Sequence, residues 1–284
     1  MIYNTLSYSQ IDSFHQCPRK WAFRYVDDIR VDKKSIALEF GTAIHETLEE
    51  LLKDESEGNH ISESEALKRY ETKTNELYNI FDRNEADEKV LAGKQAISDF
   101  ANYQGFYHRL RGQEILGIEE GFNLALPITF QGQSTEINIR GFIDLVYRDK
   151  SGIVVVDHKS SKKVFDKRKR MDNLQLPIYF MAIKQKYGEL PYAGIYNFTQ
   201  LGKEQVSLCT KKKTAEMKQA MEKRGAKTIW AKTEKEATKD IVQTFKDMNN
   251  KSKRLETRPT PLCFWCDFRS ICKDASSWRP KEEE

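Results

Sequence analysis

The residues best suited to chemistry are two aspartates and a lysine in neighbouring segments. Asp144 ends a Gly-Phe-Ile-Asp segment, and a Val-Asp-His-Lys segment supplies Asp157 and Lys159. If the two segments pair as a hairpin closed around Lys150 and Ser151, Asp144 lies directly opposite Asp157, with Cβ atoms ~4.5–5.5 Å apart. A four-residue loop centred at the same place gives the same register.

Two carboxylates this close require a cation or a shared proton, because like charges opposite one another destabilise a sheet. Carboxylate oxygens suit Mg²⁺ or Mn²⁺. Lys159 lies two residues beyond Asp157, so an extended strand points both side chains to the same face. Two carboxylates, a metal ion and an ammonium group fit hydrolysis of a phosphate diester. The alternative is that Asp144 and Asp157 end their strands at solvent and that Lys159 pairs with one of them.

The segments around these residues predict a mixed α/β core. Residues 115–127 and 129–147 are expected to form strands, and the β-branched run 153–156 is typical of a buried strand. A helix over 173–187 and a strand over 192–199 are expected to follow. Strands and helices in this order indicate a central sheet with helical additions.

Helices are expected before and after this core. An apolar stripe that begins at Ile44 predicts a helix over 38–53, and residues 62–111 are expected to continue as helices. Residues 211–254 are polar and rich in lysine, and we interpret them as one or two solvated helices.

The composition indicates a globular protein but does not show whether it binds nucleic acid. Of the 284 residues, 39% are hydrophobic and 11% aromatic, which is enough for a sizeable core. The net charge of +4 neither requires nor excludes nucleic acid, so local patches must decide. No segment has the apolar length of a membrane span, and the first residues lack the layout of a secretion signal. We therefore expect a cytoplasmic protein with no membrane partner.

Four of the five cysteines are spaced so that they could bind one metal centre. Cys263, Cys266 and Cys272 lie near one end of the chain and Cys17 near the other, so they converge only if the two ends meet. An odd number of cysteines without an export signal disfavours a disulfide framework. Four thiolates suit either Zn²⁺ or an iron–sulfur cluster, and their spacing alone leaves both open.

A basic segment follows the second aspartate. Residues 162–170 carry six lysines and arginines against one aspartate. A loop of this charge beside a metal could clamp phosphates, and the alternative is a solvated loop. The segment with Arg19, Lys20, Trp21 and Arg24 could stack on and pair with a single strand, or it could pack around the cysteine site, and we expect packing for Trp21 and Phe23.

Together these motifs resemble the PD-(D/E)XK nuclease superfamily. More narrowly, they resemble its RecB-like iron–sulfur branch, which includes CRISPR-associated adaptation nucleases and AddB-type nuclease domains. The Gly-x-x-Asp that ends at Asp144 and the Asp-x-Lys of 157–159 are similar to the catalytic signature. Residues 41–45 match the GxxxH helix of that branch, and residues 175–179 match its QxxxY helix. Glu119 matches an acidic residue found ahead of the first catalytic strand.

The resemblance implies a metal site, a catalytic set and a cluster. The metal ligands would be His45, Asp144, Asp157 and the main-chain carbonyl of His158. The catalytic set would be Asp144, Asp157, Lys159, Gln175, Tyr179 and Glu119. A 4Fe–4S cluster would be held by Cys17, Cys263, Cys266 and Cys272, with zinc as the alternative; Cys209 fits no position and would be a spare thiol. Taken without the resemblance, His45 could be a core histidine, Gln175 and Tyr179 could decorate a helix face, and Glu119 and Glu120 could be surface charges.

The resemblance also implies fold and function. We expect a mixed sheet flanked by helices in a single nuclease domain, with an N-terminal helical region over residues 1–112, a catalytic core over residues 113–200, and C-terminal helices and the cysteine segment over residues 201–284. The expected activity is a metal-dependent DNA exonuclease that acts on single strands or DNA ends in recombination, repair or replication, with a helicase or recombination protein as a possible partner. Two alternatives are a CRISPR-adaptation-type nuclease and a catalytically silent, cluster-bearing DNA-binding subunit.

Overall fold

The computed structural model describes residues 3–31, 35–102, 104–210 and 228–277. Its helices and strands form a mixed α/β protein, which confirms the predicted fold class. By its internal contacts the chain divides into two compact units: unit 1 comprises residues 1–33, 123–141 and 235–284, and unit 2 comprises residues 34–122 and 142–234. The single nuclease domain expected from the sequence stays a prediction.

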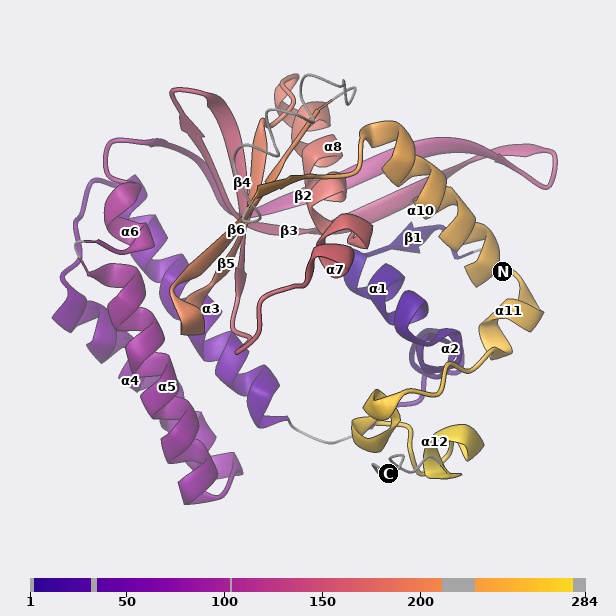
Figure 1. Ribbon diagram of the computed structural model, residues 1–284, viewed down its shortest axis with the longest axis horizontal. Coiled ribbons are helices and arrows are strands. Elements are labelled where there is room, and N and C mark those ends of the chain that lie inside the picture. Colours follow the sequence, from indigo (N-terminus) through magenta and orange to yellow (C-terminus); the bar gives the residue numbers. More distant parts are fainter. Residues whose placement is uncertain (1–2, 32–34, 103, 211–227, 278–284) are drawn as a thin grey trace. The chain divides into compact units, whose positions relative to one another are not determined.

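A mixed sheet forms the centre of unit 2 (Figure 1). Strand β4 pairs antiparallel with β3 and parallel with β5, and β6 and β7 continue the sheet beyond β5. Strand β2 pairs with β3, and both strands also contribute residues to unit 1. The strands span Glu114–Phe130 (β2), Gln133–Asp149 (β3), Gly152–Lys159 (β4), Ala193–Phe198 (β5), Lys203–Leu208 (β6) and Thr228–Trp230 (β7).

The β3–β4 hairpin has the register that the sequence predicts. Leu145 lies opposite Val156, and the hairpin is closed around Lys150 and Ser151. Residues 153–156 are all buried. A strand covered on both faces reads as a continuous apolar run rather than an alternating one, which is why this segment could be recognised.

Helices α3 to α6 share one hydrophobic core with the sheet in unit 2. Phe40 and Ile44 of α3 belong to this core together with Val154 and Val156 of β4. Because side chains alternate along a strand, Asp157 points to the other face, where α8 packs against β4. The helices of unit 2 are α3 (Ile36–Ser56), α4 (Glu63–Ile80), α5 (Arg83–Ala101), α6 (Phe106–Arg109), α7 (Lys167–Asp172) and α8 (Gln175–Tyr187).

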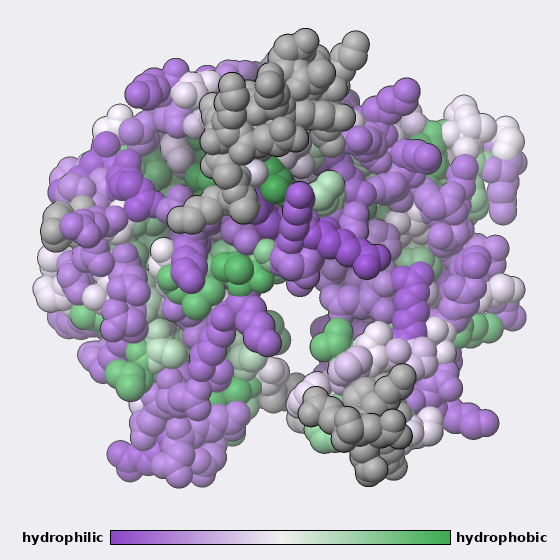
Figure 2. Space-filling model, in the orientation of Figure 1, coloured by the Kyte–Doolittle hydropathy of each residue, from purple (hydrophilic) through white to green (hydrophobic). Residues whose placement is uncertain are grey.

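The helices of unit 2 have the polarity expected of elements that cover a core. Helix α3 contains the whole of the predicted helix 38–53. The visible side of α4 and α5 is mostly hydrophilic (Figure 2), which agrees with their one-sided burial pattern. Across the described ranges, no helix combines the length and apolarity needed to cross a membrane.

Unit 1 brings together segments from both ends of the chain. Trp21 and Phe23 are both buried there, as predicted, with Tyr3 and Phe14 edge-on to the Trp21 ring at centroid distances of 5.6 and 5.4 Å. Phe23 lines the cavity that the four cysteines share, whereas Trp21 does not. The short strand β1 pairs in parallel with β3, where Leu6 lies opposite Ile139. The elements are β1 (Thr5–Leu6), α1 (Tyr8–Gln16), α2 (Pro18–Tyr25), α10 (Glu234–Met248), α11 (Lys251–Leu255), η2 (Pro261–Trp265) and α12 (Lys273–Ser277).

The turn between β2 and β3 differs from the prediction. It lies at Gln131 and Gly132, whereas the expected strands 115–127 and 129–147 place it at Ile128. Both turn residues have positive φ, 51° and 78°, the conformation that a type I′ two-residue hairpin turn requires. Pro127 stays inside β2 because β2 pairs only with β3 in the described sheet, and an outer strand tolerates a missing N–H.

The prediction of helices alone after residue 201 is wrong. Strands β6 and β7 extend the sheet, and the described part of the predicted helical segment 211–254 contains β7, α10 and most of α11. Both strands are short, and β6 carries polar residues at 203–205, so neither produces a clear alternating pattern. Residues 211–227 of the predicted helices lie outside the described residues.

Candidate metal centre and thiol cavity

Three side chains of unit 2 converge as a set that could hold a metal ion. His45 of α3, Glu119 of β2 and Asp144 of β3 each offer one ligand atom, and these atoms lie within 4.8 Å of one another. His45 Nδ1 is 3.6 Å from Asp144 Oδ2. One imidazole nitrogen with carboxylate oxygens suits a divalent cation such as Mn²⁺ or Mg²⁺. Among the residues that the structure describes, no other group of three or more His, Cys, Asp or Glu side chains meets this criterion.

Glu119 reaches the site through an unusual main-chain conformation. Its φ is 47° within strand β2, in the left-handed region that a residue with a side chain rarely adopts. Such outliers in the middle of a strand mark bulges that redirect side chains, and they concentrate at functional sites. The neighbouring Glu120 forms an ion pair with Lys186 instead. The two glutamates that the sequence did not separate are thus distinguished by geometry.

Asp144 is bound to the adjacent strand by a main-chain donor. The His158 N–H donates a hydrogen bond to Asp144 Oδ2 over 2.6 Å, directly beyond the paired residues of β3 and β4. Burial raises the pKa of Asp144 well above its usual value, and the nearby charge of Asp157 adds to the effect. Burial also raises the pKa of Glu119. Acids that ionise this reluctantly are stabilised as carboxylates by a cation between them.

Asp157 is oriented by the first turns of α8. It is 3% exposed, and its Oδ1 accepts hydrogen bonds from Gln175 Nε2 over 2.6 Å and from the Tyr179 hydroxyl over 3.3 Å. Gln175 and Tyr179 can act on one atom because residues four apart share a helix face. Burial raises the pKa of Tyr179, so the phenol stays a neutral donor.

Lys159 lies on the same face as Asp157 and completes the site. Its Nζ is 2.7 Å from Asp157 Oδ2 and donates to Gln175 Oε1 over 3.0 Å. The side chain is 25% exposed, so the ammonium can meet a substrate. Although Lys159 lies beside it, the buried Asp157 Oδ2 accepts no hydrogen bond within the described residues. That oxygen is therefore held by an ion pair with the ammonium group.

The His158 side chain is held in the core beside His45, with the two ring centroids 6.4 Å apart. The Asn197 amide lies 3.0 Å from His158 Nδ1, and the Phe100 and Phe106 rings approach edge-on at centroid distances of 5.6 and 5.7 Å. Burial lowers the pKa of His158 to about 3, so its ring is neutral. Sequence reasoning missed Asn197, although a polar residue in the otherwise apolar strand β5 is a signal that could have identified it.

The predicted active-site residues all lie in unit 2. Asp157 is outside the convergent group of three, because its carboxylate is engaged by α8 and Lys159. The predicted residues at or beside the site are His45, Glu119, Asp144, Asp157, His158, Lys159, Gln175 and Tyr179. Their chemical roles stay predictions.

The basic segment 162–170 divides into exposed residues and one buried residue. Lys167, Arg168 and Lys169 are exposed, as a phosphate-binding role requires. Arg170 is 6% exposed and donates to the Val206 carbonyl of β6 over 2.7 Å. Arg170 therefore holds the segment to the sheet, unlike the other five basic residues.

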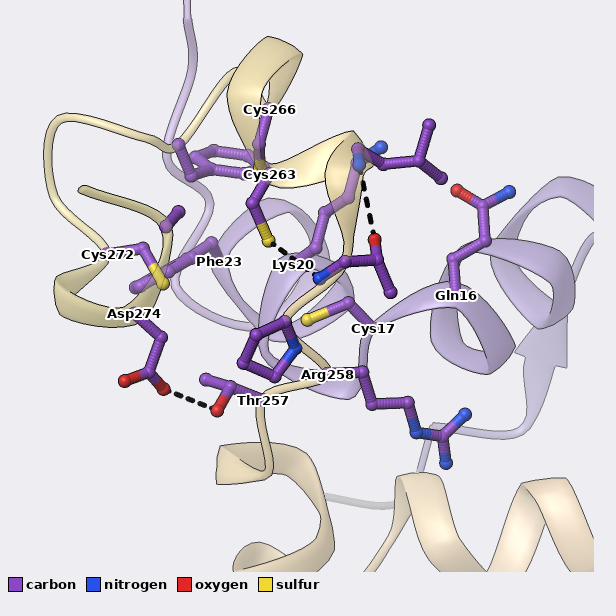
Figure 3. Close-up of a pocket in the computed structure, with 15 residues that line it drawn as sticks. Gln16, Cys17, Lys20, Phe23, Thr257, Arg258, Cys263, Cys266, Cys272 and Asp274 are labelled. Atoms are coloured by element: carbon purple, nitrogen blue, oxygen red, sulfur yellow. Dashed lines mark hydrogen bonds between the residues drawn. The ribbon is translucent and has the colours of Figure 1, made fainter. Parts of the chain in front are cut away.

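Four cysteines line one cavity in unit 1 (Figure 3). Cys17 comes from the start of α2, and Cys263, Cys266 and Cys272 come from η2 and the residues after it. In the close-up, the Cys17, Cys263 and Cys272 sulfur atoms point toward the same space. The two ends of the chain thus meet at the thiols, as the spacing required.

The thiols are not gathered into a formed cluster site. No three of their sulfur atoms lie within 4.8 Å of one another, although all five cysteines are among the described residues. Cys209 does not line the cavity. Burial raises the pKa of the Cys209 thiol to about 12, so this sulfur is a poor ligand and a poor nucleophile at neutral pH.

Comparison with known proteins identifies the family. No curated protein matches the chain. Among solved structures, the crystal structure of SSO0001 is similar over 96% of this chain and 87% of that chain, with 16% sequence identity and a TM-score of 0.39. The family model of the PD-(D/E)XK nuclease superfamily matches residues 5–273, which include the carboxylates, Lys159 and all five cysteines. The chain belongs to the PD-(D/E)XK nuclease superfamily.

Proposed function

We propose that this nuclease is a metal-dependent DNA exonuclease that hydrolyses phosphodiester bonds in single-stranded DNA or at DNA ends. The observation that carries the proposal is the convergence of His45, Glu119 and Asp144 beside the Asp157–Lys159 pair. These groups combine ligands for a divalent cation with an ammonium group that can reach a substrate. Membership of a nuclease superfamily supports phosphodiester hydrolysis as the reaction.

The donor set fits Mg²⁺ or Mn²⁺. His45, Glu119, Asp144 and Asp157 would hold the ion, together with the main-chain carbonyl of His158. The ligand atoms of His45, Glu119 and Asp144, which lie within 4.8 Å of one another, support this assignment. When bound, the cation supplies Lewis-acid polarisation of the phosphate and lowers the pKa of water.

Lys159 would stabilise the negative charge that develops on the phosphate. An ammonium group has three N–H donors. Contacts with Asp157 and Gln175 fix its position, which leaves donor capacity for a phosphate oxygen or for the attacking water. Because these partners hold the ammonium in place before substrate binds, little reorganisation is needed in the transition state.

The exposed basic residues of segment 162–169 would bind the DNA backbone. They follow β4 directly, so they lie a few residues after Lys159 in the chain. Lysine and arginine contacts to phosphates position nucleic acid without reading its sequence. An exonuclease that degrades DNA of any sequence requires this kind of contact.

End-labelled single- and double-stranded oligonucleotides with Mg²⁺ or Mn²⁺ test the activity. We expect the wild type to release nucleotides or short fragments. Asp157→Asn and Lys159→Ala should each lower the rate at least about 100-fold, because each removes a group that acts on the developing charge. Matched controls are Asp87→Asn and Lys184→Ala, whose side chains lie in surface contacts with Tyr78 and Glu234.

The same assay separates the alternatives. A wild type that binds DNA but cuts none with either metal would contradict the nuclease proposal and support a silent DNA-binding subunit. Full activity of Lys159→Ala would contradict the role given to the lysine. Internal cleavage of circular single-stranded DNA at the rate seen for linear DNA would contradict an exonuclease and leave an endonuclease.

We also propose that Cys17, Cys263, Cys266 and Cys272 hold a structural 4Fe–4S cluster, as in the RecB-like iron–sulfur branch. Zn–S bonds of about 2.3 Å would bring four tetrahedral sulfurs to about 3.8 Å from one another. In a 4Fe–4S cluster each thiolate binds a different iron, so the four sulfurs stand farther apart. Four cysteines that line one cavity support a shared metal centre, and the metal content of the protein distinguishes iron from zinc.

Metal analysis of anaerobically purified protein tests the cluster. We expect about four iron and four sulfide per chain and a broad absorbance near 400 nm. Serine at any of the four cavity cysteines should lower the iron content and the melting temperature. Cys209→Ser is the matched control and should change neither. Zinc in place of iron would contradict the cluster proposal without affecting the nuclease proposal.

A further inference from the structure

One large apolar side chain is exposed inside a strand. Phe142 of β3 is 65% exposed. The other exposed large hydrophobic residues of the described chain lie in helices, turns or loops. An apolar ring left in water forfeits the free energy of burial, so Phe142 does not contribute to the sheet as a core residue does.

Phe142 lies on the strand that carries a carboxylate of the metal site, two residues before Asp144. Strand alternation puts these two side chains on the same side, and the residues between and after them, Ile143 and Leu145, are fully buried. Two residues of a strand span about 6.6–6.8 Å. The ring therefore lies within one nucleotide's reach of the carboxylates.

A glycine leaves room beside the ring. A Cβ atom built at Gly121 of β2 would lie 3.5 Å from Phe142 Cε1, so the ring edge passes over the position where another residue would carry a side chain. Gly121 follows Glu119 by two residues, just as Phe142 precedes Asp144 by two. On each of the two strands, the position of the aromatic ring is therefore two residues from a carboxylate of the candidate metal site.

We propose that Phe142 is a stacking platform for the nucleobase next to the phosphodiester that is cut. The proposal rests on the proposed nuclease function and names a further determinant of how its substrate binds. Aromatic rings bind unpaired bases without regard to sequence, because every base has a π-face. A base in a duplex is already stacked on both sides, so the platform favours single-stranded DNA or frayed ends. The neighbouring Lys159 and metal ligands bind the phosphate, which leaves the base as the group that meets Phe142.

The test combines removal of the ring with removal of the base. Phe142→Ala should lower kcat/KM on single-stranded DNA about 5- to 100-fold. DNA with one abasic nucleotide at the position that stacks should be cut by the wild type with a similar loss. Phe142→Ala should lose no more on abasic DNA than on intact DNA, because base and ring act as one pair. Positions are scanned by moving the abasic nucleotide along a substrate with a single cleavable linkage.

Three variants separate stacking from a structural role. Phe142→Trp should keep the wild-type preference for intact over abasic DNA. Phe142→Leu still covers Gly121 but cannot stack, so it should behave as Phe142→Ala. Leu91→Ala removes a side chain that is 70% exposed on α5, and it should not change the cleavage of either intact or abasic DNA. Wild-type activity of Phe142→Leu would overturn the proposal. So would a combined loss, for Phe142→Ala on abasic DNA, equal to the product of the separate losses from removing the ring and removing the base.

A binding measurement keeps this proposal separate from the nuclease proposal. Single-stranded DNA with 2-aminopurine at the stacking position is bound in Ca²⁺ to Asp157→Asn protein. We expect a fluorescence change on binding, because stacking quenches this base analogue, and its loss in the Asp157→Asn, Phe142→Ala double variant. If the wild type cuts no DNA, the nuclease proposal fails on its own. An equal fluorescence change with and without the ring would overturn the stacking platform.

Discussion

Gln175 Nε2 donates a hydrogen bond to Asp157 Oδ1 over 2.6 Å and so links the first turn of α8 to strand β4. The Oε1 atom of the same amide accepts from Lys159 Nζ over 3.0 Å. An amide can do both because it carries a donor and an acceptor side by side. Gln175 is 7% exposed, so water competes little for these bonds. The carboxylate and the ammonium are therefore oriented as a pair by one side chain.

Gln175→Leu should lower activity and Mn²⁺ affinity about 10- to 100-fold, the loss typical of partners that orient metal ligands. Leucine keeps most of the volume but offers neither hydrogen bond, so Asp157 and Lys159 both lose their orientation. Steady-state cleavage rates and titration calorimetry with Mn²⁺ measure the two effects. Gln243→Leu on α10, where the amide donates to Asp247, is the matched control.

Tyr179→Phe provides a graded comparison for the same carboxylate. The hydroxyl that it removes contacts Asp157 at 3.3 Å, a longer bond than the one from Gln175. Lys159 is untouched by this change, so we expect only a few-fold loss. Equal losses in Tyr179→Phe and Gln175→Leu would contradict the dual role of the amide.

We expect Asp144 to make the stability of the metal-free protein depend on pH. Burial holds the pKa of this carboxyl well above its usual value of about 3.9. Its protonated form therefore stabilises the fold below the unfolded pKa, and that contribution is lost as pH rises through the raised pKa. In EDTA, Asp144→Asn should melt a few degrees higher than the wild type at pH 8, and the difference should shrink toward pH 4. Thermal melts across this range measure it.

Added metal should reverse the order of the melting temperatures of the wild type and Asp144→Asn. At pH 8, Mn²⁺ should raise the melting temperature of the wild type, because an ion that binds only the folded state stabilises it by mass action. Asp144→Asn lacks one ligand and should respond weakly. A larger metal response in Asp144→Asn than in the wild type would contradict the assignment of Asp144 as a ligand.

Some relationships in the site followed from the sequence because their geometry is local. The two-residue turn gave the β3–β4 register up to Leu145 and Val156, the residues next to Asp144 and Asp157, and strand alternation placed Lys159 on the face of Asp157. Helix periodicity likewise put Gln175 and Tyr179 on one face. These relationships depend on the repeat of one hairpin or one helix, which can be counted along the chain.

Other features depend on contacts between segments that are distant in the sequence, so they could not be derived by counting residues along one helix or hairpin. Glu119 reaches the site through a positive φ, and the sequence gives no sign of it because the residue is neither glycine nor asparagine, the types that favour this conformation. Asn197 faces His158 because β5 lies parallel to β4, a pairing that the sequence does not specify residue by residue. Arg170 belongs to a basic run, yet the position of β6 turns it inward. Strands as short as β7 leave too few residues for a period to be recognised.

The basic segment should respond differently at neighbouring positions. Arg168→Ala removes an exposed charge, so single-stranded DNA affinity should fall and its dependence on salt concentration should weaken, without a change in melting temperature. Arg170→Ala removes the buried hydrogen bond to Val206, so the melting temperature should fall. Fluorescence anisotropy at several salt concentrations and thermal melts separate the two. A stable Arg170→Ala protein that only binds DNA more weakly would contradict the inward role.

Tyr70 and Gly93 set the spacing between α4 and α5. A Cβ atom at Gly93 would lie 1.8 Å from the Tyr70 hydroxyl, whose oxygen is buried without a hydrogen-bond partner among the described residues. Gly93→Ala should therefore destabilise the protein by about 1–3 kcal/mol through overpacking, although alanine is ordinarily favoured in a helix. Tyr70→Phe should be neutral or stabilising by about 1 kcal/mol, because it deletes an unsatisfied hydroxyl. In the double variant the loss should be smaller than in Gly93→Ala alone. Urea unfolding gives the three free energies, and a stability gain in Gly93→Ala would show that the helices can move apart freely.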